Sequence, residues 1–255
     1  MKIATWNVNS LKVRLAQVID WLARMQPDVL ALQETKTPDD SFPLAEFEAV
    51  GYQASYSGQK TYNGVAVLSK SAQSHPVTDI PELDDPQRRI LAVSVERVRI
   101  VNLYVVNGQE VGSEKFDYKL HWLEQVRKYL RAELVEYPNL VVLGDFNIAP
   151  EDRDVHDPKL WHEKILCSSR EREALRKLLA EGLVDVFRNF DQPQKSFSWW
   201  DYRAAAFRRN RGLRIDLILA SNALAEHCTA AVIDTAPRTH DRPSDHAPVY
   251  AEFSL

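Results

Sequence analysis

Asp145 and Asn147 are the polar pair in this sequence whose spacing points most clearly to chemistry. They follow the apolar run from Leu140 to Leu143. Side chains two residues apart at the end of a strand point to the same side, and strand ends are where α/β enzymes usually hold their reacting groups. A Gly144-Asp145 turn that merely ends a strand explains this stretch alone equally well. Other parts of the chain decide between the two interpretations.

Polar residues also stand near the ends of other predicted strands. They are Asn7, Glu34, Tyr104, Asn107, Asp216, Asp245 and His246. This set is rich in oxygen, holds one histidine and contains no thiolate, so it favours Mg²⁺, Mn²⁺ or Ca²⁺ over zinc. Such groups suit phosphoryl chemistry, in which a metal neutralises charge and a carboxylate or histidine activates water. Each residue alone has an ordinary explanation as a surface acid, turn former or salt-bridge partner, but together these explanations require several coincidences.

The N-terminal elements are expected to bring the first of these strand ends together. The pattern predicts a strand over residues 1–6, a helix capped by Ser10 and ended by Pro27, and a buried strand over 29–33 that leads into Glu34. Weaker signals predict a short helix after Pro43, strands over 52–56 and 65–68, and a hairpin of strands 89–95 and 98–105 that ends near Tyr104.

The C-terminal half contains further predicted helices and strands. A helical stripe spans 115–137, a strand covers 140–143, and Ser168 with Glu171 forms a capping box that begins another helix. The long polar connection over 151–167 has the length of a functional loop. Asp216 lies inside the apolar strand 213–219, where an acid is costly to bury without a partner. Strands over 230–233 and 248–253 follow, and His246 precedes the last.

Composition bounds the class of protein. A chain of 255 residues with 45% hydrophobic content is expected to form one domain over residues 1–255, and we expect a monomer. No signal peptide or membrane-spanning run is apparent, which favours a cytoplasmic protein without a membrane partner. Cys167 and Cys228 are far apart in the sequence and are expected to be free thiols.

The charge is unevenly distributed. The net charge of −4 gives no global attraction to nucleic acid, but five arginines lie between residues 203 and 214 with no acid among them. They are Arg203, Arg208, Arg209, Arg211 and Arg214. A solvated loop and a phosphate-contacting surface are equally good interpretations of this run until a catalytic site is found beside it.

The ordered set of motifs resembles the exonuclease III family of apurinic/apyrimidinic (AP) endonucleases over residues 3 to about 253. The matching stretches are Thr5-Trp6-Asn7-Val8-Asn9, Leu32-Gln33-Glu34-Thr35-Lys36, Tyr62-Asn63-Gly64-Val65-Ala66, Asn102-Leu103-Tyr104-Val105-Val106-Asn107-Gly108, Gly144-Asp145-Phe146-Asn147, Leu213-Arg214-Ile215-Asp216 and Ser244-Asp245-His246-Ala247-Pro248. The resemblance implies an α/β fold that is a four-layered sandwich, with two mixed β-sheets packed face to face and flanked by helices. The active site would lie at one edge.

The resemblance also implies roles for the polar strand ends. Metal ligands would come from Asn7, Glu34, Asp145, Asn147, Asp245 and His246. Catalytic groups would be Tyr104, Asp145, Asn147, Asp216 and His246, with Asp145 on the attacking water, Asn147 and Tyr104 on the scissile phosphate, and Asp216 supporting His246. In the wider superfamily, Tyr104 and the stretch from Leu213 to Asp216 favour the DNA-repair members over DNase I-type nucleases and inositol phosphatases.

Substrate recognition is less firmly indicated. Candidate DNA-binding residues are Lys60, Asn107, Lys115, Lys119, Trp199, Arg203, Arg208, Arg209 and Arg211. Trp199 is equally explained as a core aromatic or as a wall of the pocket for an extruded sugar. Some relatives have a tryptophan where Leu213 stands, and Leu166 with Cys167 is expected to influence which lesion fits.

The sequence predicts a Mg²⁺-dependent DNA-repair phosphodiesterase, with Mn²⁺ able to substitute. It would cleave double-stranded DNA 5′ to abasic sites and remove 3′ blocking groups or nucleotides. One alternative is a specialised 3′-phosphatase or 3′-exonuclease without abasic-site incision. The other is a non-catalytic regulator that has the same fold and binds nucleic acid. Such a regulator would lack some of the metal-binding or catalytic residues, but all of the expected residues are present in this sequence.

Overall fold

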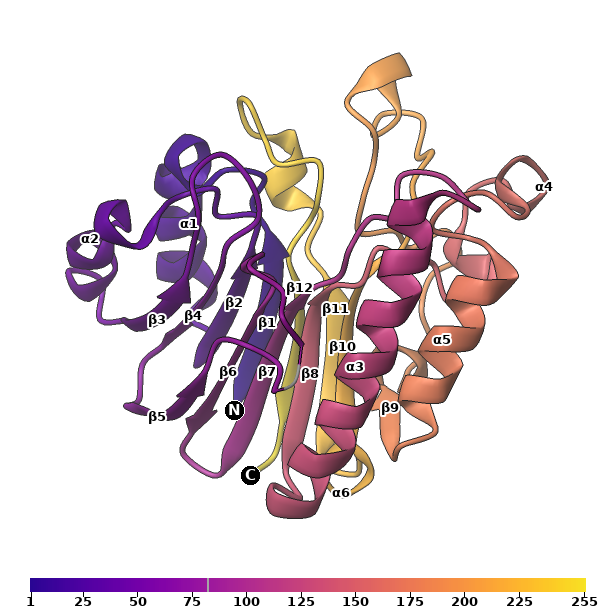
Figure 1. The fold of residues 1–255 in the computed structure, drawn as a ribbon. Coiled ribbons are helices and arrows are strands. Elements are labelled where there is room, and N and C mark those ends of the chain that lie inside the picture. The colour runs from indigo at the N-terminus through magenta and orange to yellow at the C-terminus, as the bar shows by residue number, and fades with distance from the viewer. Residues whose placement is uncertain (82) are drawn as a thin grey trace.

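Two six-stranded β-sheets form the centre of the computed structural model, which describes residues 1–81 and 83–255 (Figure 1). The first sheet has the order β11 (Cys228–Ile233), β12 (Val249–Phe253), β1 (Lys2–Asn7), β2 (Val29–Gln33), β4 (Val65–Ser69), β3 (Gln53–Ser57). The second has the order β5 (Gln73–Val77), β6 (Ile90–Val95), β7 (Val98–Tyr104), β8 (Leu140–Asp145), β10 (Asp216–Ser221), β9 (Leu183–Asp185). The sheets are mixed, because β1 and β2 pair in parallel, as do β7 and β8, while their other strand pairs are antiparallel.

The sheets pack face to face and the longer helices cover their outer faces. The helices are α1 (Leu11–Met25), α2 (Leu44–Glu48), α3 (Glu114–Glu136), α4 (Pro158–Trp161), α5 (Ser169–Leu179) and α6 (Asn222–Ala225). Apolar side chains of both sheets, among them Val29 and Val141, share one core cluster between the sheets. A second cluster joins α1 to the first sheet, and a third joins α3 and α5 to the second. This arrangement confirms the expected four-layered sandwich.

The parallel pairs bring the polar strand ends to one edge, which lies at the top of Figure 1. Asn7 ends β1 and Asp145 ends β8, while Glu34 follows β2 directly. Gly144 allows β8 to approach β7 closely, because a Cβ at this position would lie 1.9 Å from the carbonyl oxygen of Leu103, and its φ of 141° is unfavourable for other residues. The glycine before Asp145 is therefore required by strand packing.

Several details differ from the sequence-based expectation. Ser10 precedes α1, but its side chain makes no capping hydrogen bond and its φ is 89°. The strand expected over 213–219 begins only at Asp216, because Leu213 instead forms single bridges with Val155 and Trp199. The edge strands β5 and β9 had no clear signal, since β5 is largely exposed and β9 is only three residues long. The capping box of Ser168 and Glu171 is confirmed.

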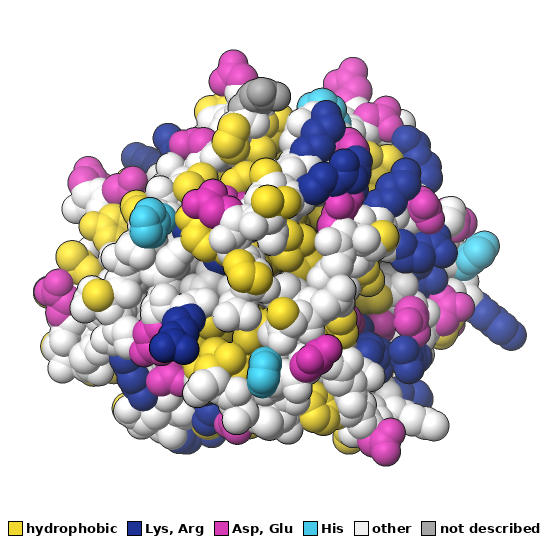
Figure 2. Space-filling model, turned by 90° about the horizontal axis from the view of Figure 1, so that it is seen from below, with side chains coloured by type: hydrophobic (Ala, Val, Ile, Leu, Met, Phe, Trp, Pro, Cys, Tyr) yellow, Lys and Arg dark blue, Asp and Glu magenta, His cyan; other side chains and the backbone are white. Residues whose placement is uncertain are grey.

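The end of the molecule opposite the polar edge is shown in Figure 2. Basic and acidic side chains lie side by side there, interspersed with hydrophobic ones. The arginine run is on the other end of the molecule, on the loop that rises above the sheets in Figure 1. Cys167 and Cys228 are free, as expected. Among the residues that the structure describes, no helix is both long and apolar enough to cross a membrane.

Candidate active site

Asn7 joins the carboxylates that come from the two sheets. Its side-chain nitrogen donates to Glu34 Oε1 at 2.8 Å and to Asp145 Oδ2 at 2.9 Å, while its oxygen accepts from the backbone N–H of Asn9. Asn7 thus presents an N–H group to the site. In this geometry Asn7 positions two carboxylates, and its role as a metal ligand stays a prediction.

Asp145 is buried and, among the residues that the structure describes, has neither lysine nor arginine as a hydrogen-bond partner. Besides Asn7, its partners are the backbone N–H of Asn147 at 2.9 Å and the Asn147 amide at 3.3 Å. Burial raises the pKa of Asp145 to about 7, against the opposing effect of a charged His246 and the amide of Asn7. A carboxyl group with such a pKa can exchange a proton near neutral pH.

His246 is held by Asp216 from the neighbouring sheet. Its Nδ1 lies 2.9 Å from Asp216 Oδ2, and its Nε2 faces Asp145 Oδ2 at 3.7 Å. Burial opposes the charge on His246, but Asp216 and Asp145 outweigh it and raise the pKa of the imidazole to about 10. Ser198 fixes the Asp216 carboxylate by donating its hydroxyl at 2.6 Å. The buried acid of the apolar strand therefore has the histidine as its partner.

Asn147 and Asn107 stand together beside Asp145. Asn147 adopts a left-handed conformation with φ 49°, which asparagine tolerates well. Its amide nitrogen donates to the carbonyl oxygen of Val105 at 3.0 Å, and its oxygen accepts from the Asn107 amide at 3.1 Å. Asn107 is exposed at the rim, whereas Asn147 is buried. The pair offers neutral amide groups next to the carboxylate.

Asp245 lies on the side of the site where α1 begins. Its oxygens accept hydrogen bonds from Asn9 Nδ2 and from the indole of Trp199, each at 3.0 Å. Burial works against the charge of Asp245, but His246, Trp199 and Asn9 outweigh it and lower its pKa. Trp199 is partly exposed, so this aromatic residue borders the site and also contacts the apolar residues beneath it.

Tyr104 ends β7 beside Glu34. Burial, followed by the charges of Glu34 and Asp145, raises the pKa of its phenol well above 10, so the hydroxyl stays protonated at neutral pH. The guanidinium of Arg89 lies 4.7 Å from the centre of the Tyr104 ring. Tyr104 can therefore act as a neutral hydrogen-bond donor.

The donor set fits a hard divalent cation. Ligand atoms of Glu34, Asp145 and His246 lie within 4.8 Å of one another, and the two carboxylates would hold the ion while the imidazole is protonated. The Lys36 ammonium already lies 2.9 Å from Glu34 Oε2 and 2.6 Å from Asn9 Oδ1, which shows that this corner of the site accepts a cation. Two carboxylates and the nearby amide groups match the ligands that Mg²⁺ and Mn²⁺ use. Asp245 lies outside this group of three residues.

Two of the expected DNA-contacting cations are not on the surface. Lys119 is fully buried and pairs with Glu171 at 2.5 Å. Arg214 is also buried and pairs with Asp154 at 2.6 Å and with Asp185 at 2.7 Å. We expected Lys119 to contact DNA and Arg214 to belong to an open basic run. Both expectations were wrong, because each side chain is buried against an acidic partner that is distant in the sequence. The other basic candidates are exposed, namely Lys60, Lys115, Arg203, Arg208, Arg209 and Arg211.

Sequence reasoning gave no role to three residues that complete the site. Asn9 connects Asp245 to Lys36, and Ser198 orients Asp216. Asn9 and Lys36 lie within the stretches that carry the resemblance, and this was the available signal for both. For Ser198 there was only its position beside Trp199, because its partner Asp216 lies eighteen positions later.

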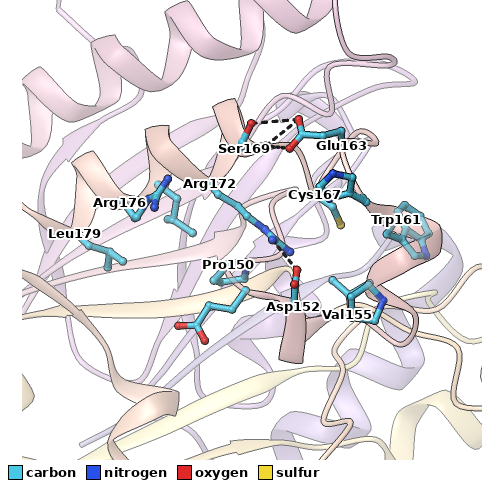
Figure 3. Close-up of a pocket in the computed structure, with 14 residues that line it drawn as sticks. Pro150, Asp152, Val155, Trp161, Glu163, Cys167, Ser169, Arg172, Arg176 and Leu179 are labelled. Atoms are coloured by element: carbon cyan, nitrogen blue, oxygen red, sulfur yellow. Dashed lines mark hydrogen bonds and ion pairs between the residues drawn. The ribbon is translucent and has the colours of Figure 1, made fainter.

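A separate pocket of about 600 Å³ lies between the 151–167 connection and α5 (Figure 3). Arg172 and Asp152 pair across it at 2.8 Å, and Cys167 and Trp161 line one side. Its lining contains none of the polar strand-end residues. We therefore place the chemistry at the polar edge, where acids, amides and a histidine converge.

Comparison with known proteins agrees with this geometry. Residues 4–246 match the model of the Endonuclease/Exonuclease/phosphatase family. The chain is 36% identical to exodeoxyribonuclease III of Haemophilus influenzae, over 99% of this chain and 100% of the relative. The chain belongs to the exonuclease III family. As a member, it is a DNA-repair nuclease of the exodeoxyribonuclease and AP endonuclease type.

Solved structures of this family resemble the chain over its full length. A Neisseria enzyme, described in one structure as a 3′ phosphatase bound to a product DNA hairpin and in another as a 3′-5′ exonuclease, is 49% identical with a TM-score of 0.98 and coverage of 100% of both chains. An AP endonuclease from Archaeoglobus fulgidus is 38% identical with a TM-score of 0.96, also with 100% coverage of both chains. The enzyme that acts on 3′ ends is the more similar of these two.

Proposed function

We propose that this exonuclease III family member removes 3′-phosphates and 3′-terminal nucleotides from duplex DNA, and that incision at abasic sites is its lesser activity. The observation that carries the proposal is the 49% identity, over both whole chains, to the Neisseria 3′ phosphatase and 3′-5′ exonuclease. The AP endonuclease at 38% identity gives weaker support to the abasic-site activity that the sequence predicted first.

The residues of the site support hydrolysis of a phosphate ester. Asp145 would orient the attacking water and accept its proton, which suits a carboxyl group whose pKa is about 7. His246, kept cationic by Asp216, would donate from Nε2 to a phosphate oxygen and stabilise the added negative charge. Tyr104 and Asn147 would hold the remaining oxygens through neutral donors.

A divalent cation fits beside Glu34 and Asp145. When bound, Mg²⁺ or Mn²⁺ would neutralise charge on the phosphate and on the oxygen that leaves. The Asn7 amide would keep the two carboxylates in place.

The substrate surface would include the exposed loop that carries Arg203, Arg208 and Arg209, together with Lys115 and Asn107, which line one groove. Phosphate contacts of this kind position duplex DNA without reading its sequence. Lys60 is exposed close to the Asn63-Gly64 turn and would extend the same surface. The structure of the Neisseria relative with a DNA hairpin supports duplex DNA as the partner.

The test is a comparison of three duplexes with purified protein and Mg²⁺. One carries a 3′-phosphate, one has a plain recessed 3′ end, and one contains an internal abasic-site analogue. The proposal expects rapid release of phosphate and of nucleotides, with incision at the abasic analogue at least about tenfold slower in kcat/KM. Faster cutting at the abasic analogue would overturn the order of activities. Metal-dependent hydrolysis of none of the three would overturn the proposed function.

A further inference from the structure

Lys119 of α3 lies fully buried directly beneath the site. A buried ammonium needs a partner for each of its donors. Its nitrogen donates to the carbonyl oxygen of Asn147 at 2.7 Å, to that of Asn107 at 3.1 Å and to Glu171 Oε1 at 2.5 Å. One side chain therefore fixes the backbone of both Asn107 and Asn147.

Glu171 links Lys119 to the C-terminal end of the 151–167 loop. Its Oε1 also accepts from the backbone N–H of Leu166 at 3.0 Å, and its Oε2 accepts from the N–H and the hydroxyl of Ser168. Leu166 has a φ of 71°, a strained conformation for a leucine that needs such support. The carboxylate thus supports the backbone at Leu166 and Ser168.

This segment is continuous with the wall of the site. The N–H of Ala149, two residues after Asn147, donates to the carbonyl oxygen of Leu166 at 2.7 Å. Leu166 and Cys167 share an apolar cluster with Trp199, whose indole donates to Asp245. The backbone of Gly108 lies close to both sides of this connection, because an added Cβ there would be 3.0 Å from Lys119 Cδ and from Ile165 Cδ1.

We propose that Lys119 and Glu171 are a positioning pair that couples Asn107 and Asn147 to the 166–168 segment, and that this coupling sets the balance between phosphate release and nucleotide release. Neither residue is catalytic, since both are buried below the reacting groups. The inference rests on the proposed function. Within that function it assigns to Lys119 and Glu171 the control of the ratio between the two activities, which the catalytic residues do not provide.

The coupling can be measured by comparing two substrates, a 3′-phosphate end and a 3′-terminal nucleotide. A 3′-phosphate and a 3′-terminal nucleotide present the same scissile phosphate to Asn147, but the nucleotide carries a nucleoside on its far side. That nucleoside has to be accommodated between the phosphate contacts and the surrounding wall. Misplacement of groups far from the chemistry can lower rates substantially when orientation matters. Loosening the wall relative to Asn147 should therefore harm nucleotide release more than phosphate release.

The test is the double variant Lys119→Met, Glu171→Gln, compared with the matched double variant Arg99→Met, Glu133→Gln. The buried Arg99 pairs at 2.6 Å with the partly buried Glu133, which lies at the other end of α3. For each protein, kcat/KM is measured on a 3′-phosphate duplex and on a plain recessed 3′ end at equal folded fraction. We expect the ratio of phosphate release to nucleotide release to rise about tenfold in the first variant and less than about twofold in the control.

Equal loss of both activities in the Lys119 variant would overturn the inference, as would an equal shift of the ratio in the control. If the Lys119 variant does not fold, Glu171→Asp gives the second test. It keeps the charge but shortens the side chain, so it cannot reach both Lys119 and Ser168. Its ratio should rise by a smaller factor, and an unchanged ratio would contradict the inference. Failure of the parent enzyme on both substrates would instead refute the proposed function.

Discussion

Asp145 and Asp154 are two buried aspartates with opposite surroundings. Asp154 is fully buried and pairs with Arg214 at 2.6 Å and with Arg188, so its charge is matched by guanidinium groups. Asp145 is equally buried, but its hydrogen-bond partners are amide groups. The cationic group that it pairs with is the imidazole of His246, whose Nε2 lies 3.7 Å from Asp145 Oδ2. Burial raises the pKa of Asp145 to about 7.

The difference separates a structural acid from a chemical one. A buried carboxylate that pairs with two arginines is fixed in one charge state. It also links distant segments, here the 151–167 connection and the residues just before β10. A buried carboxylate that has no arginine or lysine as its hydrogen-bond partner can bind a metal ion or exchange a proton. The two aspartates therefore predict different consequences when each loses its charge.

Asp145→Asn should have the largest effect on activity. It removes the proton acceptor while keeping the size of the side chain, so kcat should fall by about a thousandfold or more. Stability in EDTA should be unchanged or slightly higher, because a buried charge is gone. Duplex binding should persist, since the basic loop is untouched. Hydrolysis of a 3′-phosphate duplex and a thermal melt measure both effects, and substantial remaining activity would contradict the role of Asp145.

Asp216→Asn should have the next largest effect, about a hundredfold loss in kcat, because the imidazole loses the charge that holds it protonated and oriented. The pKa of His246, about 10 in the intact site, should fall. Activity needs the protonated imidazole, so the alkaline limb of the pH profile should move to lower pH. An alkaline limb that stays in place would show that His246 does not depend on Asp216.

The strand ends, the layers and the order of the motifs were predictable from the sequence. Apolar runs that end in polar residues define where strands stop, and Asp145 with Asn147 already suggested a shared direction. The buried cations were not predictable. Lys119 looked like a surface cation because Glu171 lies 52 positions away, and Arg214 looked like part of an open run because Asp154 lies 60 positions before it.

The proposed preference for 3′ ends over abasic sites was harder to predict for a related reason. The residues that would shape the pocket, Leu166, Cys167 and Trp199, act through packing in one apolar cluster. Sequence motifs report the reacting groups, which the family uses for several substrates. They do not report how neighbouring loops pack against those groups.

Arg214→Met should affect stability far more than chemistry. It leaves the buried Asp154 and the partly buried Asp185 without their shared partner, which should cost about 3–5 kcal/mol of unfolding free energy. Measured at equal folded fraction, kcat should change by less than about threefold, because Arg214 makes no contact with Asp145 or His246. Urea unfolding and activity at low temperature test this. A large fall in kcat with unchanged stability would contradict the assignment of Asp154 as a structural acid and Asp145 as a chemical one.

The smallest effect is expected from the exposed arginines. Arg208→Ala and Arg209→Ala should each weaken duplex binding severalfold and lower the slope of log affinity against log salt by about one. Stability and kcat at saturating DNA should stay the same. Fluorescence anisotropy at several salt concentrations measures the slope. A slope equal to that of the parent would remove that arginine from the DNA-binding surface.

The most direct test is single-turnover release of phosphate from a 3′-phosphate duplex with Mg²⁺, at saturating enzyme and equal folded fraction. The proteins to compare are the parent, Asp145→Asn and Asp154→Asn. The parent should act rapidly, Asp154→Asn should stay within about threefold of it, and Asp145→Asn should lose about a thousandfold or more. No activity in the parent, or equal losses in both variants, would contradict the assignment of the site and of its function.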